Sequence, residues 1–509
     1  MTSNNKSSIA SGYDQLSTAY SFNEVTEEGR GRRGELIKCV SGIIDKTDIS
    51  LKKTQTLMTD ESQPSHSGKS VSDEGRPLSV FFQSCLPFLF GGLGSILSGL
   101  VVNQVQKTAL LCEVPQFLAI CVPLQGMKGN LDMTFTSRLG TMAHQGRFKS
   151  GTQTVKIMRN MCLIQAQAIF LTLFATLMTF AMETLRQGIE HHPPVENFVF
   201  LGSNSLIAMN IASAATGTIM VILVIVSLRF ALDPDNIATP IASSLGDLFT
   251  IVIMIGIAEI YFPFSSLSIW VPLTVTAIFC ALSPVAVFIA SKDEQAWVAA
   301  RQQGPTFLLA AVLSSGAGVV QAFGATMFPE LTVYQPLIAA NSGNRAGLQS
   351  ARISSYLNTY TGPNRRRMRL NPWKYYTSND IESRAAFILL ISCPAYQIIF
   401  VFTAHLIAYI GLSPLKLNIL FLVGYLCTYF FQTFILVYLA EILVYSLFRY
   451  GLDPDMHAIP LLTSIGDLMG TSLLFLLFYL MSFIRDTVVV SSMTSGEMAE
   501  NATSTCAYE

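Results

Sequence analysis

The chain of 509 residues has little charge, because Asp, Glu, Lys and Arg together make up 13% of it and the formal net charge is −1. Nothing in so weakly charged a chain supports nucleic acid binding. The six histidines form no repeated cluster, which argues against a zinc or copper site. The nine cysteines show neither metal-ligand nor disulfide-framework spacing, so we predict that they are small core residues.

Apolar residues are abundant instead. They form 51% of the chain and occur in runs of roughly twenty or more, each long enough to cross about 30 Å of hydrocarbon. We therefore predict an all-α polytopic membrane protein with about eleven transmembrane helices. The predicted spans lie near residues 78–104, 113–143, 157–185, 196–229, 235–261, 267–290, 304–327, 332–358, 383–410, 414–447 and 455–484.

The chain ends and the loops predict the orientation in the membrane. Residues 1–75 are rich in Ser, Thr, Gly, Lys and Glu and lack the apolar region of a signal peptide, so we predict a disordered cytosolic tail. With that tail inside, the inward loops hold most of the loop Lys and Arg, including the run Arg365 to Arg367. An odd number of spans then predicts a short extracytosolic tail at residues 487–509.

One segment of the chain occurs twice. DPDNIATPIASSLGDL at residues 233–248 recurs as DPDMHAIPLLTSIGDL at residues 453–468. A second pair, at residues 125–140 and 341–356, keeps Gly-Asn followed eight residues later by Arg. The order of these elements is the same in both halves, so each half is predicted to be a five-helix repeat. The predicted domains are a first repeat at 76–262, a linking helix with a cytosolic loop at 263–303, and a second repeat at 304–486.

The linking helix determines how the two repeats are oriented. Two five-span units joined directly would point in opposite directions across the membrane, but one additional crossing makes them parallel. Parallel repeats are related by a pseudo-twofold axis along the membrane normal, and equivalent helices can meet on that axis.

Each copy of the repeated segment places one carboxylate, Asp247 or Asp467, in the middle of an apolar span. An ionised carboxylate costs at least ~2.5 to 3.5 kcal/mol there by insertion scales, and neither has a repeated basic partner on its own helix. Pro240 and Pro460 each remove a backbone hydrogen bond about two turns earlier. Polar and small residues on the same helices are candidates to line an ion path: Ser243, Ser244, Gly246, Thr463, Ser464 and Gly466. The alternative is that the hydroxyl groups only join helices to one another.

Two carboxylates that converge on a twofold axis suit a hard divalent cation. Mg²⁺ prefers oxygen ligands, is held by one or two carboxylates and retains several waters, whereas Ca²⁺ usually takes more protein ligands. We therefore predict that Asp247 and Asp467 bind Mg²⁺ as a transported substrate. Asn130 and Asn344, from the Gly-Asn segments, could offer side-chain oxygens to the hydrated ion.

Two further carboxylates are candidates for coupling or gating. Asp132 occurs only in the first half, next to the Gly-Asn pair, so an asymmetry of coupling could lie there. Glu441 lies in an apolar run of the second half. For Glu441, pairing with a nearby base is the alternative.

The segments KGNLDMTFTSRLGT, DPDNIATPIASSLGDL and DPDMHAIPLLTSIGDL resemble the solute carrier family 41 magnesium transporters, eukaryotic relatives of the bacterial MgtE channels. The resemblance covers nearly everything after the tail and implies two MgtE-like membrane domains fused in one chain. It implies that Asp247 and Asp467 match the aspartate that binds hydrated Mg²⁺ in the pore, and that Asn130 and Asn344 match a segment near the ion path. It also suggests sodium-coupled Mg²⁺ efflux at the plasma membrane, which makes Na⁺ a second expected ion. The magnesium-sensing domains of the bacterial relatives have no counterpart in residues 1–75.

The resulting prediction is a magnesium transporter of the lipid bilayer with no enzymatic activity and no cofactor. An uncoupled magnesium channel is one alternative. An intramembrane aspartyl protease also needs two carboxylates that share a proton, but such proteases have a Gly-x-Gly-Asp motif and two unlike aspartate segments. A membrane scaffold without an ion path would neutralise the two aspartates with buried basic partners.

Overall fold

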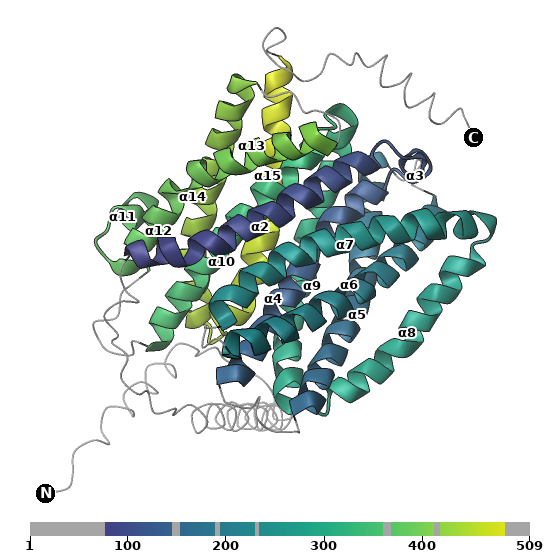
Figure 1. Cartoon of the computed structure of the whole chain (residues 1–509), viewed down its shortest axis with the longest axis horizontal. Coiled ribbons are helices and arrows are strands. Elements are labelled where there is room, and N and C mark those ends of the chain that lie inside the picture. The colour runs from purple at the N-terminus through teal and green to yellow at the C-terminus, as the bar shows by residue number, and fades with distance from the viewer. Residues whose placement is uncertain are drawn as a thin grey trace, which may run out of the picture. The chain divides into compact units, whose positions relative to one another are not determined.

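The computed structural model describes residues 77–144, 153–188, 194–229, 234–359, 368–411 and 418–483. Within these ranges all regular structure is helical, and the helices are labelled α2 to α15 (Figure 1). The predictions for the tails at 1–75 and 487–509 lie outside the described residues. So do the side chains of Pro240, Ser243 and Ser244, although their backbone is helical.

The long helices follow the predicted spans closely. The first half consists of α2 (Pro77–Val105), α4 (Phe117–His144), α5 (Gln153–Gln187), α6 (Val195–Arg229) and α7 (Pro234–Leu267), with the short α3 (Ala109–Glu113) after α2. The linking helix is α8 (Trp270–Ala290). The second half consists of α9 (Glu294–Met327), α10 (Leu331–Thr359), α12 (Ile381–Ile391), α13 (Cys393–Gly411), α14 (Ile419–Arg449) and α15 (Pro454–Ser482), with the short α11 (Pro372–Tyr376) before α12.

Nine helical segments of the described chain are long and apolar enough to cross a membrane, with α12 and α13 together forming one of them. The prediction of an all-α polytopic membrane protein is therefore confirmed. The helices α4 and α10 are not among the nine, because they carry the polar Gly-Asn segments. Most of their residues are nevertheless buried, since other helices surround them. The number of eleven crossings stays a prediction.

The break between α12 and α13 has a local cause and a partner from another helix. Pro394 lies in the first turn of α13 and has no backbone N–H with which to continue the hydrogen bonding of α12. The buried guanidinium of Arg345, on α10, donates from Nη1 to the Leu389 carbonyl and to Ser392 Oγ, each at 2.8 Å. It also lies over the ring of Tyr396, 5.0 Å from the centroid. Arg345 therefore fastens the break to the interior of the second half.

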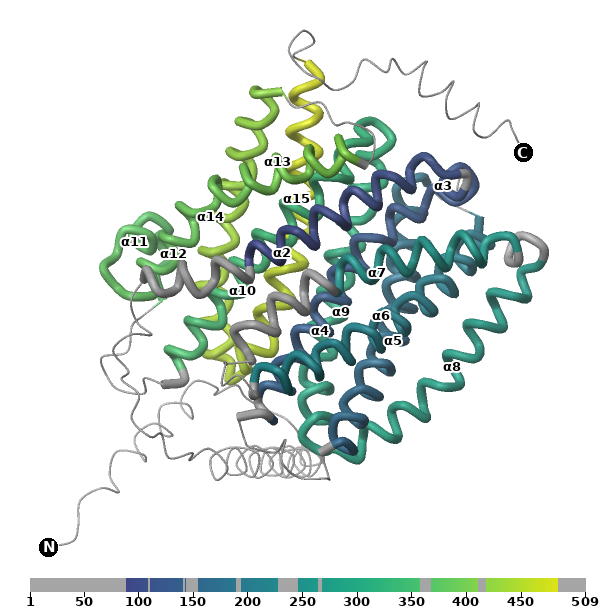
Figure 2. The backbone as a smooth tube through the Cα atoms, in the orientation of Figure 1, coloured from purple at the N-terminus to yellow at the C-terminus, as the bar shows by residue number. Residues whose placement is uncertain are grey.

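The two halves pack in the same way, and the first helix of each half also packs against the other half. The helix α2 packs against α7 of its own half and against α10 of the other half (Figure 1). In the same manner, α9 packs against α15 of its own half and against α4 of the first half. The linking helix α8 follows one edge of the bundle beside α5 and α6, and little of it is buried (Figure 2).

A glycine at the corresponding place in each half allows these contacts between the halves. A Cβ on Gly99 of α2 would overlap the Val333 carbonyl oxygen of α10, and a Cβ on Gly318 of α9 would overlap the Ala119 carbonyl oxygen of α4. The contacted residues are separated by 333 − 119 = 214 positions, the same offset as the two Gly-Asn segments. Because glycine has no side chain, the helix backbones come into direct contact at both positions.

The described cysteines follow the prediction only in part. Cys121 and Cys393 are buried and unpaired, whereas Cys280 and Cys427 are unpaired and exposed on the surfaces of their helices. Cys112, between α2 and α4, is disulfide-bonded. The prediction that the cysteines are small core residues is therefore wrong at Cys280 and Cys427, which are exposed, and at Cys112, which is paired. Spacing along a chain does not reveal which residues meet in space.

Candidate functional site

A cavity of about 40 Å³ lies where α4, α7, α10 and α15 meet. Both repeated aspartates line it, although they belong to different halves and are 220 residues apart (467 − 247). Both carboxylates are buried, with Asp247 8% and Asp467 9% exposed. The described residues that line it are Val122, Gln125, Gly126, Gly129, Asn130, Met133, Asp247, Gln335, Pro336, Ala339, Ala340, Asn344, Thr463 and Asp467.

The Asp467 carboxylate reaches from α15 to helices α9 and α4. Ser314 of α9 donates a hydrogen bond from Oγ to Asp467 Oδ2 at 2.9 Å. On α4, the position of a Cβ on Gly126 lies 2.7 Å from the same oxygen, so only glycine leaves room for the carboxylate there. The glycine of α4 therefore decides where the aspartate of the other half can lie.

The two asparagines of the Gly-Asn segments also face the cavity. Thr463 of α15 donates from Oγ1 to Asn130 Oδ1 of α4 at 3.0 Å, which joins the two halves at the site. Asn344 of α10 lies beside Gly91 of α2, whose Cβ position is 3.8 Å from Asn344 Nδ2. Carboxylate, amide and hydroxyl oxygens thus surround the cavity, and neither His nor Cys is among the described residues that line it. This is the ligand chemistry that hard divalent cations prefer.

Other predicted residues lie on the same helices but away from the cavity. Ser464 Oγ donates to the Pro460 carbonyl at 2.8 Å, within its own helix. Gly466 faces Leu436 of α14, and Gly246 faces Asp132 of α4. None of these residues belongs to the cavity lining. Their positions fit the packing interpretation, since they let neighbouring helices approach the Gly-Asp segments.

Among the residues that the structure describes, no cluster of three or more His, Cys, Asp or Glu could enclose a metal ion. The cavity instead combines two carboxylates with neutral oxygen donors. A cation held in this way would keep part of its water shell, because two carboxylates cannot fill its coordination sphere.

Known proteins match the same parts of the chain. The family model of MgtE, described as a divalent cation transporter, matches residues 121–257 and 335–477. Solute carrier family 41 member 3 of Rattus norvegicus is 33% identical over 430 residues, which cover 82% of this chain and 91% of that protein. Solute carrier family 41 member 2 of Homo sapiens is 31% identical over 411 residues, which cover 79% of this chain and 71% of that protein. The chain belongs to the MgtE family and to solute carrier family 41.

The MgtE match occurs twice, once in each half. The first match contains Asn130 and Asp247, and the second contains Asn344 and Asp467. The family predicted from the motifs is therefore confirmed, and it is a family of divalent cation transporters. Among solved structures, the eukaryotic MATE transporter AtDTX14 aligns over 79% of this chain with 11% identity and a TM-score of 0.16, which carries no argument about the fold.

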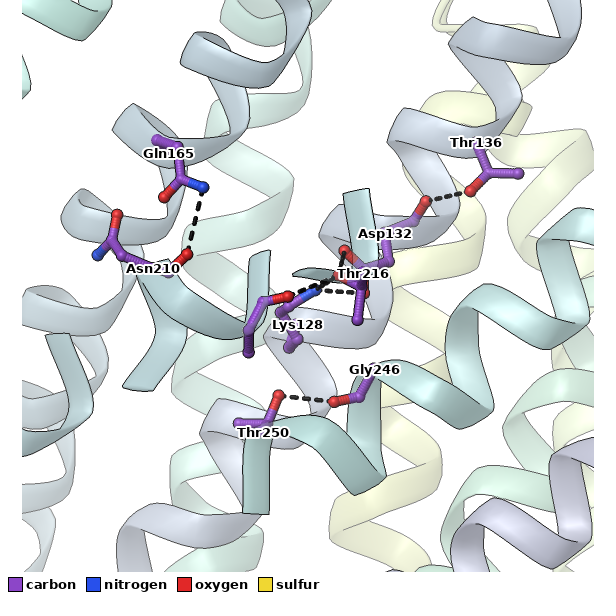
Figure 3. A network of polar contacts seen from close by, with 9 residues as sticks. Lys128, Asp132, Thr136, Gln165, Asn210, Thr216, Gly246 and Thr250 are labelled. Carbon is purple, nitrogen blue, oxygen red and sulfur yellow. Dashed lines mark hydrogen bonds and ion pairs between the residues drawn. The ribbon is translucent and has the colours of Figure 1, made fainter. Parts of the chain in front are cut away.

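In this MgtE protein, the candidate coupling residue Asp132 lies outside the cavity and forms an ion pair with Lys128, one turn earlier on α4. Lys128 Nζ also donates to Thr216 Oγ1 of α6 at 2.6 Å, and that hydroxyl oxygen lies 3.2 Å from Asp132 Oδ1 (Figure 3). All three residues are buried. We did not predict the pair, although a Lys and an Asp four residues apart on a helix could have suggested it.

Glu441 also lies away from the cavity. It is fully buried on α14, and its Oε1 accepts a hydrogen bond from the backbone N–H of Arg369 at 3.4 Å. This contact holds the segment before α11 against α14. The structure thus brings together Asp247, Asp467, Asn130, Asn344 and Thr463, and it places Asp132 and Glu441 elsewhere.

Proposed function

We propose that this protein transports Mg²⁺ across a membrane and that Asp247 and Asp467 bind the ion in the cavity between α4, α7, α10 and α15. The observation that carries the proposal is that both repeated carboxylates line one cavity. Mg²⁺ is the substrate of this proposal rather than a resident cofactor.

The electrostatics of the cavity support a cation as its occupant. Two like charges in a low-dielectric interior repel each other, and a divalent cation between them offsets both. The described residues that line the cavity include no Lys, Arg or His. Lys128 is the basic residue whose charge acts on Asp247, but its hydrogen bonds go to Asp132 and Thr216. This arrangement argues against a scaffold in which buried bases neutralise the aspartates.

The ligand set and the size of the cavity favour Mg²⁺. Besides the aspartates, the lining offers the side-chain oxygens of Asn130, Asn344 and Thr463. A volume of about 40 Å³ exceeds the roughly 10–15 Å³ that one water needs. Since Mg²⁺ is reluctant to lose its waters, a polar site with few carboxylates and room for water fits it better than an enclosing cage would.

The pseudo-twofold relation of the two halves belongs to the same proposal. Two observations support such an axis: α2 and α9 each pack against the other half, and Gly99 and Gly318 make the corresponding close contacts. An axis of this kind passes through the interface at which the two aspartates meet, so each half would supply one carboxylate to one ion.

For transport itself, we propose sodium-coupled Mg²⁺ efflux at the plasma membrane, with the amino terminus cytosolic and the carboxyl terminus extracytosolic. The coupling and the membrane rest on the resemblance to solute carrier family 41, and the orientation rests on the distribution of Lys and Arg. An uncoupled magnesium channel is the alternative. Mg²⁺ flux from proteoliposomes with and without an opposing Na⁺ gradient separates the two, because a channel would not respond to the gradient.

The site is tested by Asp247→Asn and Asp467→Asn, each measured as Mg²⁺ flux in proteoliposomes. Removal of one carboxylate charge should slow transport by about tenfold or more, the change that ~1.4 kcal/mol of lost binding gives. Asp453→Asn is the matched control, because Asp453 is exposed and caps the same α15, and Asn caps a helix equally well. Transport at the wild-type rate by both cavity variants would exclude the proposed site.

A further inference from the structure

A charged cluster lies directly behind the first Gly-Asp segment. It consists of Lys128 and Asp132 of α4 and Thr216 of α6, and it faces the backbone of α7 at Gly246 (Figure 3). The position of a Cβ on Gly246 is 2.8 Å from Asp132 Oδ2 and 3.7 Å from Lys128 Cγ. The cluster is therefore in contact with the residue that precedes Asp247, although it lies outside the cavity.

Stability alone does not account for a fully buried ion pair at this place. Replacing such a pair with apolar residues is often neutral or stabilising, because the desolvation of both charges offsets their attraction. Inside a membrane helix an ionisable residue is by default a sign of function. The cluster therefore needs a role beyond packing.

The second half of the same chain fills the equivalent place without charge. The residues at an offset of 214 from Lys128 and Asp132 are Ser342 and Ala346. Gln432 of α14 donates from Nε2 to Ser342 Oγ at 2.8 Å and to the Gly466 carbonyl at 2.9 Å. A neutral network thus supports the second Gly-Asp segment, so the fold does not require an ion pair behind the first.

The Lys128 ammonium has two carboxylates within electrostatic range, Asp132 and Asp247. It is bonded to Asp132 and to Thr216, neither of which lines the cavity. Without the Asp132 charge, Asp247 would be the only one of these two carboxylates that attracts the ammonium. An ammonium paired with Asp247 would compete with any cation for that carboxylate.

We propose that Asp132 is a positioning residue that holds the Lys128 ammonium away from Asp247 and so keeps the Asp247 carboxylate available to the transported cation. This inference rests on the proposed function. It makes the two aspartates of the site unequal, because a paired Lys and Asp stand behind Asp247 and a neutral amide stands behind Asp467.

The test is a rescue experiment on the full chain in lipid nanodiscs, titrated with MgCl₂ in a calorimeter. Asp132→Asn removes the negative charge that holds the ammonium, so the Mg²⁺ affinity should fall by about tenfold or more. Adding Lys128→Met to Asp132→Asn removes the competitor, and the affinity should return to within about threefold of the wild type. A structural role for the pair predicts a similar rescue of stability, because a single unpaired buried charge destabilises more than removal of the pair does. The affinity is therefore measured on folded protein, for which a purely structural role predicts wild-type affinity in Asp132→Asn as well.

Two results would overturn the inference: wild-type affinity in Asp132→Asn, or a double variant as weak as the single one. If Asp132→Asn does not fold, the variant Lys128→Ser with Asp132→Ala carries the second-half residues at both positions. It should bind Mg²⁺ within about threefold of the wild type. A loss of binding in this folded variant would mean that the pair belongs to the binding site itself, which also overturns the inference.

The same titration separates this inference from the proposed function. A wild-type chain that binds no Mg²⁺ would remove both. Binding that Asp247→Asn abolishes but Asp132→Asn leaves unchanged would remove the role of Asp132 alone.

Discussion

Gly126→Ala would place a methyl group against the Asp467 carboxylate. The Cβ position of Gly126 lies 2.7 Å from Asp467 Oδ2 and 3.2 Å from Ser314 Oγ. To reach an ordinary contact of 3.4 Å, the carboxylate oxygen would have to move by about 0.7 Å (3.4 − 2.7). Binding groups need their geometry held within about 0.5 Å, so we expect Mg²⁺ transport to fall by about tenfold or more.

The fold should tolerate the same change. An extra methyl group in a packed interior costs about 1–3 kcal/mol, and Ala in place of Gly within a helix recovers about 1 kcal/mol. The assay is the initial rate of Mg²⁺ flux in proteoliposomes, normalised to the amount of folded protein. Gly256→Ala is the matched control on α7, since nothing lies within 4 Å of its Cβ position, and it should transport as the wild type does.

Wild-type transport by folded Gly126→Ala would refute this reasoning, because the position of the Asp467 carboxylate would then not matter for transport. A loss of transport in Gly256→Ala as well would assign the effect to the loss of glycine in general rather than to the cavity.

Two further predictions concern the fold. Arg345→Met should destabilise the protein by about 1.5–3 kcal/mol, the range for a hydrogen bond to a charged group. The assay is thermal unfolding in nanodiscs. Arg301→Met is the control, because Arg301 is exposed, and it should leave the unfolding midpoint unchanged. An unchanged midpoint in Arg345→Met would contradict the role assigned to Arg345. Gly318→Ala should push α9 away from α4 and reduce the folded, monodisperse fraction in size-exclusion chromatography. Gly304→Ala on the same helix, where nothing lies within 4 Å of the Cβ position, is its control, and equal yields of the two variants would argue against the backbone contact.

The helices α4 and α10 show what a pattern of apolar residues can predict about the positions of helices. Both were predicted at nearly the observed positions, at residues 113–143 and 332–358, from runs of apolar residues. Those runs are interrupted by polar residues, and neither helix is among the nine segments that are long and apolar enough to cross a membrane. A helix surrounded by other helices can carry polar side chains, because its neighbours rather than lipid supply their partners.

The candidate site shows the complementary limit. Asp247, Asp467 and Asp132 look alike in the sequence, since each is a carboxylate in a helix with small and polar neighbours. The structure separates them, because the first two line the cavity and the third is bonded to Lys128. Thr463 and Ser464 differ in the same way, as one donates to Asn130 across the interface and the other to its own helix.

The amino-acid sequence by itself determined the class of the protein, its duplicated organisation and the two aspartates worth testing. These properties are local, because the length of an apolar run and a repeated segment can be read without knowing what lies beside them. Only the tertiary structure decided which polar groups share a cavity, which of them pair with each other, and that α2 and α9 pack across the two halves. The energy of a buried polar group depends on partners from distant parts of the chain, and only the folded arrangement of the helices supplies them.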